Sequence, residues 1–269
     1  MVSTSGTANA QRSWELAARA GYAVSGVLHV LIGVLALQVA FGSGAKQADQ
    51  SGALGTIAAT PFGGIVLWFA VVAFLALGAW QVAKAIHGGS PTTGGRGEGS
   101  AGDRAKAIGR AAVYLALAFT SFTFARGGAS SSSQQTADTT AKLMSAPGGR
   151  VLVAAVGLAI VVVGGYHVYK GWKKKFLEDL HRLPSGTAGP VVRRLGVAGY
   201  VLKGVALAIV GVLFVTAAVE ANPSKATGLD GALHTLRDQP AGVVLLVIVA
   251  LGFIAYGVYS FVRARYGRI

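Results

Sequence analysis

Residues 19–33 read RAGYAVSGVLHVLIG, and two later stretches, 104–118 and 197–211, read RAKAIGRAAVYLALA and VAGYVLKGVALAIVG. Each stretch is followed at a similar distance by a closing motif: GAWQVAK from Gly78, GGYHVYK from Gly164 and GVYSFVR from Gly257. Before each closing motif lies a proline with a glycine two residues on, as in Pro61 and Gly63, Pro147 and Gly149, and Pro240 and Gly242. Self-similarity at a fixed period is typical of repeat architectures, so the chain is predicted to contain three copies of one unit.

Every copy carries two long apolar windows. Hydrophobic residues make up 53% of the 269 residues, charged residues 13%, and the mean hydropathy is +0.57. The windows without any acidic or basic residue are Ala20–Gly42, Gly63–Ala83, Ala111–Ala125, Val151–Tyr169, Gly204–Val219 and Ala241–Val262. About 20 apolar residues in a helix cross the hydrocarbon core, and a helix satisfies its own backbone there. We therefore predict an all-α membrane protein with six transmembrane helices, built as three pseudo-repeated hairpins that would suit a pseudo-threefold axis.

Polar segments set the predicted boundaries between the copies. In chain order they give a polar leader over 1–18 with a short interfacial helix near 14–18, hairpin repeats over 19–88, 104–176 and 193–269, a Gly/Ser-rich linker over 89–103, and a connection over 177–192.

Smaller patterns lie within these segments. KKKFLEDLHRL, residues 173–183, predicts a short helix lying in the membrane interface. SSSSQQTADTT, residues 130–140, is typical of a polar loop. A short amphipathic helical turn is predicted before each proline from residue pairs at i, i+3: Leu54 and Ile57, Thr140 and Leu143, and Leu233 and Leu236.

The net charge of +14 is unevenly distributed. Most Lys and Arg residues lie in the leader, in 84–110, in 170–194 and after Val262. This asymmetry indicates a multi-pass membrane protein with both termini and the two long basic connections in the cytoplasm. Basic residues beside membrane ends favour anionic lipids as partners, whereas a nucleic-acid partner would need a soluble basic face or a known module. A partner membrane protein or a second copy of the chain is also compatible with this pattern.

Motifs for catalysis are missing from the sequence. It has no cysteine, no GxSxG, HExxH or Walker sequence, and no carboxylate inside an apolar window. The last point disfavours proton- or cation-coupled transport, which commonly uses carboxylates within the membrane. We therefore expect no enzyme activity, no catalytic residue, no metal site and no cofactor.

Polar side chains inside the windows are the candidates for function. His29 lies near the middle of its predicted helix, and its counterparts in the repeats are Tyr114 and Leu207. It could carry a proton or ligate haem, or it could be a neutral imidazole bonded to a facing helix. Haem would need a second ligand, and His167 lies nearer the cytoplasmic end.

A second set of residues recurs at equivalent positions near the predicted cytoplasmic ends. Ser25, Arg110 and Lys203 are equivalent in the opening helices. The closing helices carry three equivalent trios: Lys84, Lys170 and Arg263; Trp80, Tyr166 and Tyr259; and Gln81, His167 and Ser260. The cations and aromatic residues could be snorkelling side chains with an aromatic belt, or they could form a site for an anion or an anionic lipid head group.

Small residues spaced seven apart predict close helix packing. Gly26 and Gly33 form one such pair, and Gly204 and Gly211 form another. Residues without side chains let membrane helices approach each other closely, so these glycines are expected to face other helices.

Together, the RxGY openings and the P-x-G…G-x-[WY]-x-x-x-[KR] closings resemble the domain of unknown function 1206 family, bacterial membrane proteins common in actinobacteria. The second repeat departs from the pattern, with Lys106–Ala107 where the others have Gly-Tyr. The resemblance implies a six-helix inner-membrane protein and brings no reaction with it. A binding, scaffold or accessory protein with a cytoplasmic-side anion or lipid site is the favoured function. The alternatives are a small-solute channel or permease and a haem-binding membrane protein.

Overall fold

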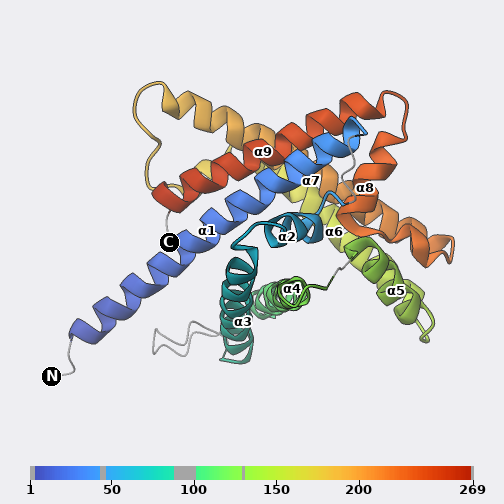
Figure 1. Cartoon of the computed structure of the whole chain (residues 1–269), viewed down its shortest axis with the longest axis horizontal. Helices are drawn as coiled ribbons and strands as arrows, with labels where there is room; N and C mark the ends of the chain where they lie inside the picture. The colour runs from blue at the N-terminus through green and yellow to red at the C-terminus, as the bar shows by residue number, and fades with distance from the viewer. Residues whose placement is uncertain (1–3, 43–46, 88–100, 129–130, 268–269) are drawn as a thin grey trace. The chain divides into compact units, whose positions relative to one another are not determined.

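The computed structural model describes residues 4–42, 47–87, 101–128 and 131–267 (Figure 1). Within these residues the chain is all-helical, and the prediction of six helices long and apolar enough to cross a membrane is confirmed. These helices are α1 (Thr4–Ala40), α3 (Gly63–His87), α4 (Ala101–Ala125), α6 (Gly149–Trp172), α7 (Ala188–Val219) and α9 (Gly242–Tyr266). The shorter elements are α2 (Gln50–Ala58), α5 (Ser132–Met144), α8 (Gly228–Arg237) and the 3₁₀ turns η1 (Lys175–Asp179) and η2 (Pro223–Lys225).

The P-x-G motif marks a tight reversal between a short helix and the next long one. The helices α2, α5 and α8 each end just before the proline, and the motif glycine begins α3, α6 or α9. A Cβ atom on Gly63, Gly149 or Gly242 would overlap the carbonyl oxygen of Ile57, Leu143 or Arg237, near the end of the preceding helix. Glycine therefore recurs at this position because only hydrogen fits there.

Two compact units make up the fold, and each is described by itself. The major unit contains residues 1–53 and 131–269, and the minor unit contains residues 54–130. In the minor unit α3 packs along α4. In the major unit α1 packs along α9 and α6 packs along α7, while α7 also contacts α9 (Figure 1).

The most extensive helix contacts join neighbouring repeats. The closing helix of repeat 1, α3, packs on the opening helix of repeat 2, α4, and α6 packs on α7 in the same way. The closing helix of repeat 3, α9, returns to α1, the opening helix of repeat 1. Within one repeat, α7 and α9 of repeat 3 are also in contact. The repeats are therefore tied to each other by their longest interfaces.

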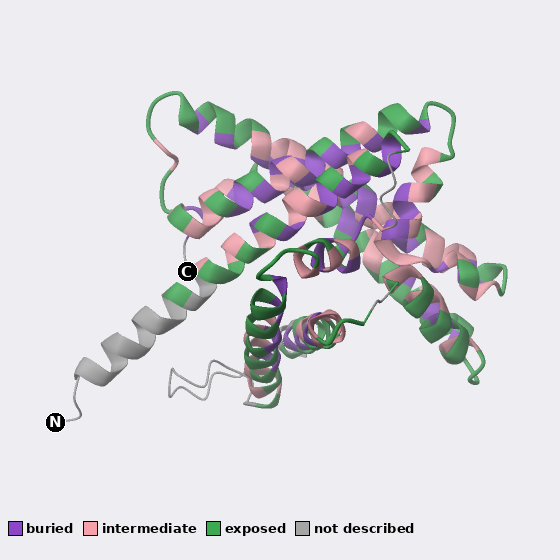
Figure 2. Ribbon diagram, in the orientation of Figure 1, coloured by how far each residue is buried: buried purple, intermediate pink, exposed green. Residues whose placement is uncertain are grey.

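The predicted packing glycines lie in these interfaces, and all four are buried. Figure 2 shows buried residues along α1 and α9, where these two helices lie side by side. A Cβ on Gly26 would lie 3.0 Å from the carbonyl oxygen of Gly257, and one on Gly33 would lie 2.7 Å from that of Ala250. On α7, a Cβ on Gly204 or Gly211 would lie 2.6 Å from a backbone oxygen of α6. The helix backbones are thus in direct contact at these points, as expected for small-residue packing in membranes.

Three local expectations differ from the structure. The leader is helical from Thr4 and continues into α1 without a separate short helix. The prediction of a polar loop over 130–140 is wrong, because α5 begins at Ser132, where Ser131 caps it by accepting a hydrogen bond from the Gln134 amide. The connection forms only the short turn η1, and its apolar side chains point into the major unit. Of the predicted linker, residues 89–100 lie outside the described residues, and 101–103 already belong to α4.

Candidate functional site

Lys203 lies near the middle of α7, and its ammonium nitrogen lies 3.0 Å from Nε2 of His29 on α1. Nδ1 of His29 lies 2.7 Å from the carbonyl oxygen of Ser25, one turn earlier. A carbonyl only accepts and an ammonium only donates, so Nδ1 carries the ring proton and Nε2 accepts from Lys203. The Lys203 nitrogen also lies 3.9 Å from the ring centroid of Tyr256 on α9. One cation thus ties together α1, α7 and α9.

This arrangement bears directly on the haem alternative. Nε2, the nitrogen of His29 that an iron would need, is already paired with Lys203. The second histidine, His167 on α6, bonds the Val163 carbonyl through Nδ1 at 2.8 Å and stacks on Tyr200, with 5.9 Å between ring centroids. Across the described ranges no group of three or more His, Cys, Asp or Glu side chains could hold a metal ion. The pairing of His29 with Lys203 therefore disfavours a haem with two histidine ligands.

Two further predicted cations share one carboxylate. Asp179, the last residue of η1, has its Oδ2 atom 2.7 Å from Nζ of Lys170 and 3.3 Å from a guanidinium nitrogen of Arg263. Each cation also faces a tyrosine: Lys170 lies 5.4 Å from the Tyr200 ring centroid and Arg263 lies 4.4 Å from that of Tyr22. The connecting segment therefore supplies a counter-ion at the ends of α6 and α9.

Phe176 fixes this connecting segment to the helices. Its side chain has no exposed surface, and its ring lies 5.4 Å from that of Tyr200 and 5.2 Å from that of Tyr259. The hydroxyl of Tyr259 donates to the backbone oxygen of Phe176 over 2.8 Å. Gly196 on α7 leaves the space for this ring, since a Cβ there would overlap it. The segment predicted to lie in the membrane interface is instead anchored in the major unit.

Tyrosine rings connect the two cation sites. The centroids of Tyr200 and Tyr256 are 5.1 Å apart, which links Lys203 to Arg263 through two adjacent rings. The whole group, called the cation–tyrosine cluster below, consists of Lys170, Lys203, Arg263, Asp179, His29, Tyr22, Tyr200, Tyr256 and Tyr259. It contains three cations and one carboxylate. Nε of Arg263 is buried and has no hydrogen-bond partner among the described residues.

Other predicted residues lie outside this cluster. Tyr166 leaves 55% of its surface exposed and touches the edge of the His167 ring. In the minor unit, Lys84 lies over the ring of its own neighbour Trp80, 5.4 Å from the centroid, and Arg110 is exposed.

The remaining two predicted polar residues of the minor unit are partly or fully covered. Tyr114 stacks on Phe74 with 6.4 Å between centroids. Gln81 is buried, and its side-chain oxygen has no hydrogen-bond partner within the described chain.

Sequence reasoning missed Asp179, Tyr200, Tyr22 and Tyr256 as members of the site. A signal existed for two of them, because Tyr22 and Tyr200 are the tyrosines of the repeated Gly-Tyr motif. No comparable signal marked Asp179, which lies in a charged segment and is far along the chain from Arg263, one of the two cations it pairs with.

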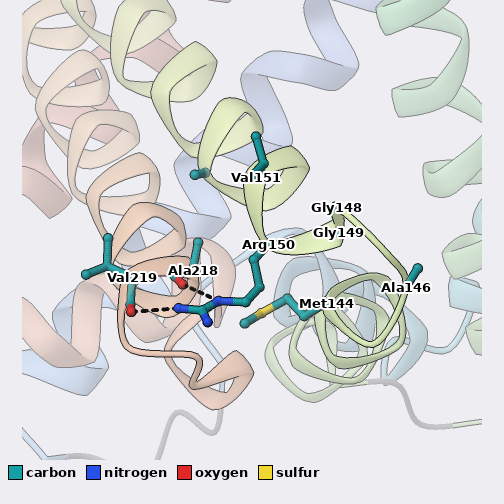
Figure 3. Close-up of a pocket in the computed structure, with 9 residues that line it drawn as sticks. Met144, Ala146, Gly148, Gly149, Arg150, Val151, Ala218 and Val219 are labelled. Carbon is teal, nitrogen blue, oxygen red and sulfur yellow. Dashed lines mark hydrogen bonds between the residues drawn. The ribbon is translucent and has the colours of Figure 1, made fainter.

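A shallow depression of about 500 Å³ lies at the opposite end of α6 and α7 (Figure 3). Arg150 is one of the residues that line it, and the Arg150 guanidinium donates to the carbonyl oxygens of Ala218 and Val219, both at 3.0 Å. These carbonyls belong to the last turn of α7, where no following turn of helix supplies amide donors to them. Arg150 therefore caps a helix end, and the lining around it is mostly apolar, with Met144 and Val151 among its members.

Six membrane-length helices in three sequence repeats, with glycine contacts between the helices of the major unit, define a multi-pass α-helical membrane protein. The family described as Domain of Unknown Function (DUF1206) matches residues 20–88, 105–174 and 198–267, and the chain belongs to this family. It is 31% identical over 253 residues to the uncharacterized protein YxxB of Bacillus subtilis (strain 168), covering 92% of this chain and 89% of that protein. No solved structure is significantly similar to it.

Proposed function

We propose that this protein is a non-enzymatic binding or accessory protein of the bacterial inner membrane, and that its cation–tyrosine cluster holds one phosphate-like anion. The anion is either a lipid head group or a soluble ion, and on the predicted topology it binds in the cytoplasmic half. The observation that carries the proposal is the charge imbalance: the cluster contains three cations but one carboxylate, Asp179, which pairs with Lys170 and Arg263 and not with Lys203.

Lys203 is the strongest part of this argument. Among the described residues no carboxylate lies within ion-pair distance of its ammonium group, whose neighbours are the imidazole of His29 and the ring of Tyr256. A cation–π contact contributes about 0.5–2 kcal/mol. A cation within a transmembrane helix costs about 2.5–3.5 kcal/mol or more. The tyrosine and the hydrogen bond to His29 together offset part of this cost, and an anion close to Lys203 would offset the rest.

Asp179 does not remove the need for an external anion. It pairs with both Lys170 and Arg263 but neutralises only one of these two charges, so that with Lys203 the cluster keeps an excess of positive charge. A phosphate oxygen would also provide the acceptor that the buried Nε of Arg263 lacks among the described residues.

Lys203→Met tests this proposal, because methionine keeps the length of the side chain and removes the charge. Lys142→Met is the matched control, since Lys142 is an exposed cation on α5 at the opposite end of the helices. The full chain is purified natively, and bound lipids are measured by mass spectrometry. In parallel, the melting temperature of delipidated protein is measured in phosphate and in chloride at equal ionic strength.

If the anion is a lipid head group, Lys203→Met should bind anionic lipid about fivefold more weakly, as expected for loss of about 1 kcal/mol. If it is a soluble ion, phosphate should raise the melting temperature of wild type but not of Lys203→Met. Lys203→Arg should keep either response, and Lys142→Met should behave as wild type. Unchanged lipid and phosphate responses in Lys203→Met would overturn the proposal.

A further inference from the structure

The segments that link the two long helices of each repeat meet at one buried polar point of the major unit. Asp49 directly precedes α2, and Asp230 is the third residue of α8. Only 2% and 7% of their surfaces are exposed. Both carboxylates bind the start of α5: the Ser132 hydroxyl contacts Asp49, and the Ser133 hydroxyl donates to Asp230 over 3.0 Å. We call these four residues the aspartate clasp.

Backbone contacts complete the clasp. The amide of Ala48 donates to Oδ1 of Asp230 over 2.8 Å, and that of Gly52 donates to Oδ1 of Asp49 over 3.0 Å. Since α2, α5 and α8 belong to repeats 1, 2 and 3, two carboxylates connect the linking segments of all three repeats. The clasp lies at the opposite end of the helices from the cation–tyrosine cluster, and it is independent of the proposed anion site.

The surroundings of Asp49 favour its protonated form. Burial, with a smaller contribution from the negative charge of Asp230, raises the pKa of Asp49 from its ordinary value of 3.8 to about 6, against the opposing amide hydrogen bonds from Gly52 and Ser51. On α8, the imidazole of His234 lies 3.5 Å from Asp230 rather than beside Asp49. The start of α5 brings only serine hydroxyls to the clasp. No described cation therefore lies within ion-pair distance of Asp49.

We propose that the aspartate clasp is an acid-closed junction, in which a proton on Asp49 holds the linking segments of the three repeats together and its loss loosens them. The protonated carboxyl no longer repels Asp230 and can still hydrogen-bond to Ser132. On the predicted topology this junction lies outside the cytoplasm, so the proton would come from the external medium.

The sign and size of the effect follow from proton linkage. A carboxyl that binds its proton more tightly in the closed junction than in the open one stabilises closure as the pH falls. This stabilisation is complete below pH 3.8 and is lost as the pH rises through 6. Between pH 7.5 and pH 5 the open fraction should fall about tenfold.

Cysteine accessibility measures this opening directly, because the natural chain contains no cysteine. Ala48 is fully buried at the clasp, whereas Gln50 two residues later is exposed. Ala48→Cys and Gln50→Cys are made as single-cysteine forms of the full chain, and each is reacted with a dithiopyridine reagent that works at acid pH. Dividing the rate at position 48 by that at position 50 cancels the intrinsic pH dependence of the thiol.

The expected result is an approximately tenfold fall of this ratio from pH 7.5 to pH 5. In the Asp49→Asn background, where position 49 cannot titrate, the ratio should be independent of pH. In the Asp230→Asn background, which removes the neighbouring negative charge, the midpoint of the fall should move to lower pH. If the ratio of the two rates does not change with pH in the chain that keeps both Asp49 and Asp230, the proposal is overturned, and this result does not depend on whether the Asn variants fold. An equal fall in Asp49→Asn would also overturn it.

Discussion

Replacing Gly204 with alanine should destabilise the contact between α6 and α7. A Cβ at this position would lie 2.6 Å from the carbonyl oxygen of Gly164 and 2.8 Å from the amide nitrogen of Val168. Both are backbone atoms, so no side-chain rotation can make room. Ordinary contact begins near 3.4 Å, and the two helices would have to separate by about 0.8 Å at this point.

The cost of this separation has two sources. Forcing a methyl group into a packed interior costs about 1–3 kcal/mol. A gap of about 0.5–1 Å also forfeits a quarter to a half of the dispersion energy of the atoms it separates. Those atoms include the neighbouring contact at Gly211, where a Cβ would lie 2.6 Å from the oxygen of Gly157. We therefore expect Gly204→Ala to lower stability by about 1–3 kcal/mol.

Gly165→Ala is the matched control. Gly165 adjoins Gly164 on α6, but a Cβ there would have nothing within 4 Å. Alanine is favoured over glycine in a helix by up to about 1 kcal/mol, so this variant should be neutral or slightly stabilised. Thermal unfolding of the purified full chain in detergent, followed by the loss of the monodisperse species, should give a melting temperature several degrees lower for Gly204→Ala. Equal melting temperatures for the two variants would refute the close-packing account.

Two further predictions concern topology and the anchored connection. Cysteines placed at Ser90 and Ser185 should resist a membrane-impermeant thiol reagent in intact cells, whereas a cysteine at Ser131 should react, because the basic segments are predicted to be cytoplasmic. Labelling at Ser185 would show that the orientation is the reverse of the predicted one. Phe176→Ala should lower the stability by about 3–5 kcal/mol, because it empties the space between Tyr200 and Tyr259. Phe41→Ala, at a position 69% exposed, should have little effect, and a similar loss in both variants would show that Phe176 is not an anchor.

The sequence predicts the helices well because their cause is local. An apolar window without charges specifies a helix, and a P-x-G motif in front of it specifies where that helix starts, regardless of the rest of the chain. The glycine spacing likewise predicts that Gly26 and Gly204 face a helix. It does not specify which helix, since any partner with small residues would fit, and the main partners lie in neighbouring repeats.

The aspartate clasp and the role of the Asp179 carboxylate could not be predicted, because their contacts, like the choice of helix partners, are not local. Each depends on residues far apart in the chain, such as Asp49 with Ser132 or Asp179 with Arg263. A polar run such as residues 130–140 reads as a loop because nothing local offsets its low hydrophobicity. It becomes a helix when Ser131 caps its start and buried carboxylates accept hydrogen bonds from its first residues.

Repetition and function draw on different positions in this protein. Contacts that recur, the P-x-G turns and the glycine crossings, are structural. The cluster around Lys203 does not recur in the other repeats. The residue equivalent to Lys203 is Ser25 on α1, whose carbonyl accepts from His29, and the exposed Arg110 on α4. His29 in turn has Tyr114 and Leu207 at its equivalent positions: Leu207 has no acceptor in its side chain, and Tyr114 stacks on Phe74 in the minor unit. A pairing that uses different positions from different repeats can form once per chain, so the proposed anion should bind with a stoichiometry of one rather than three.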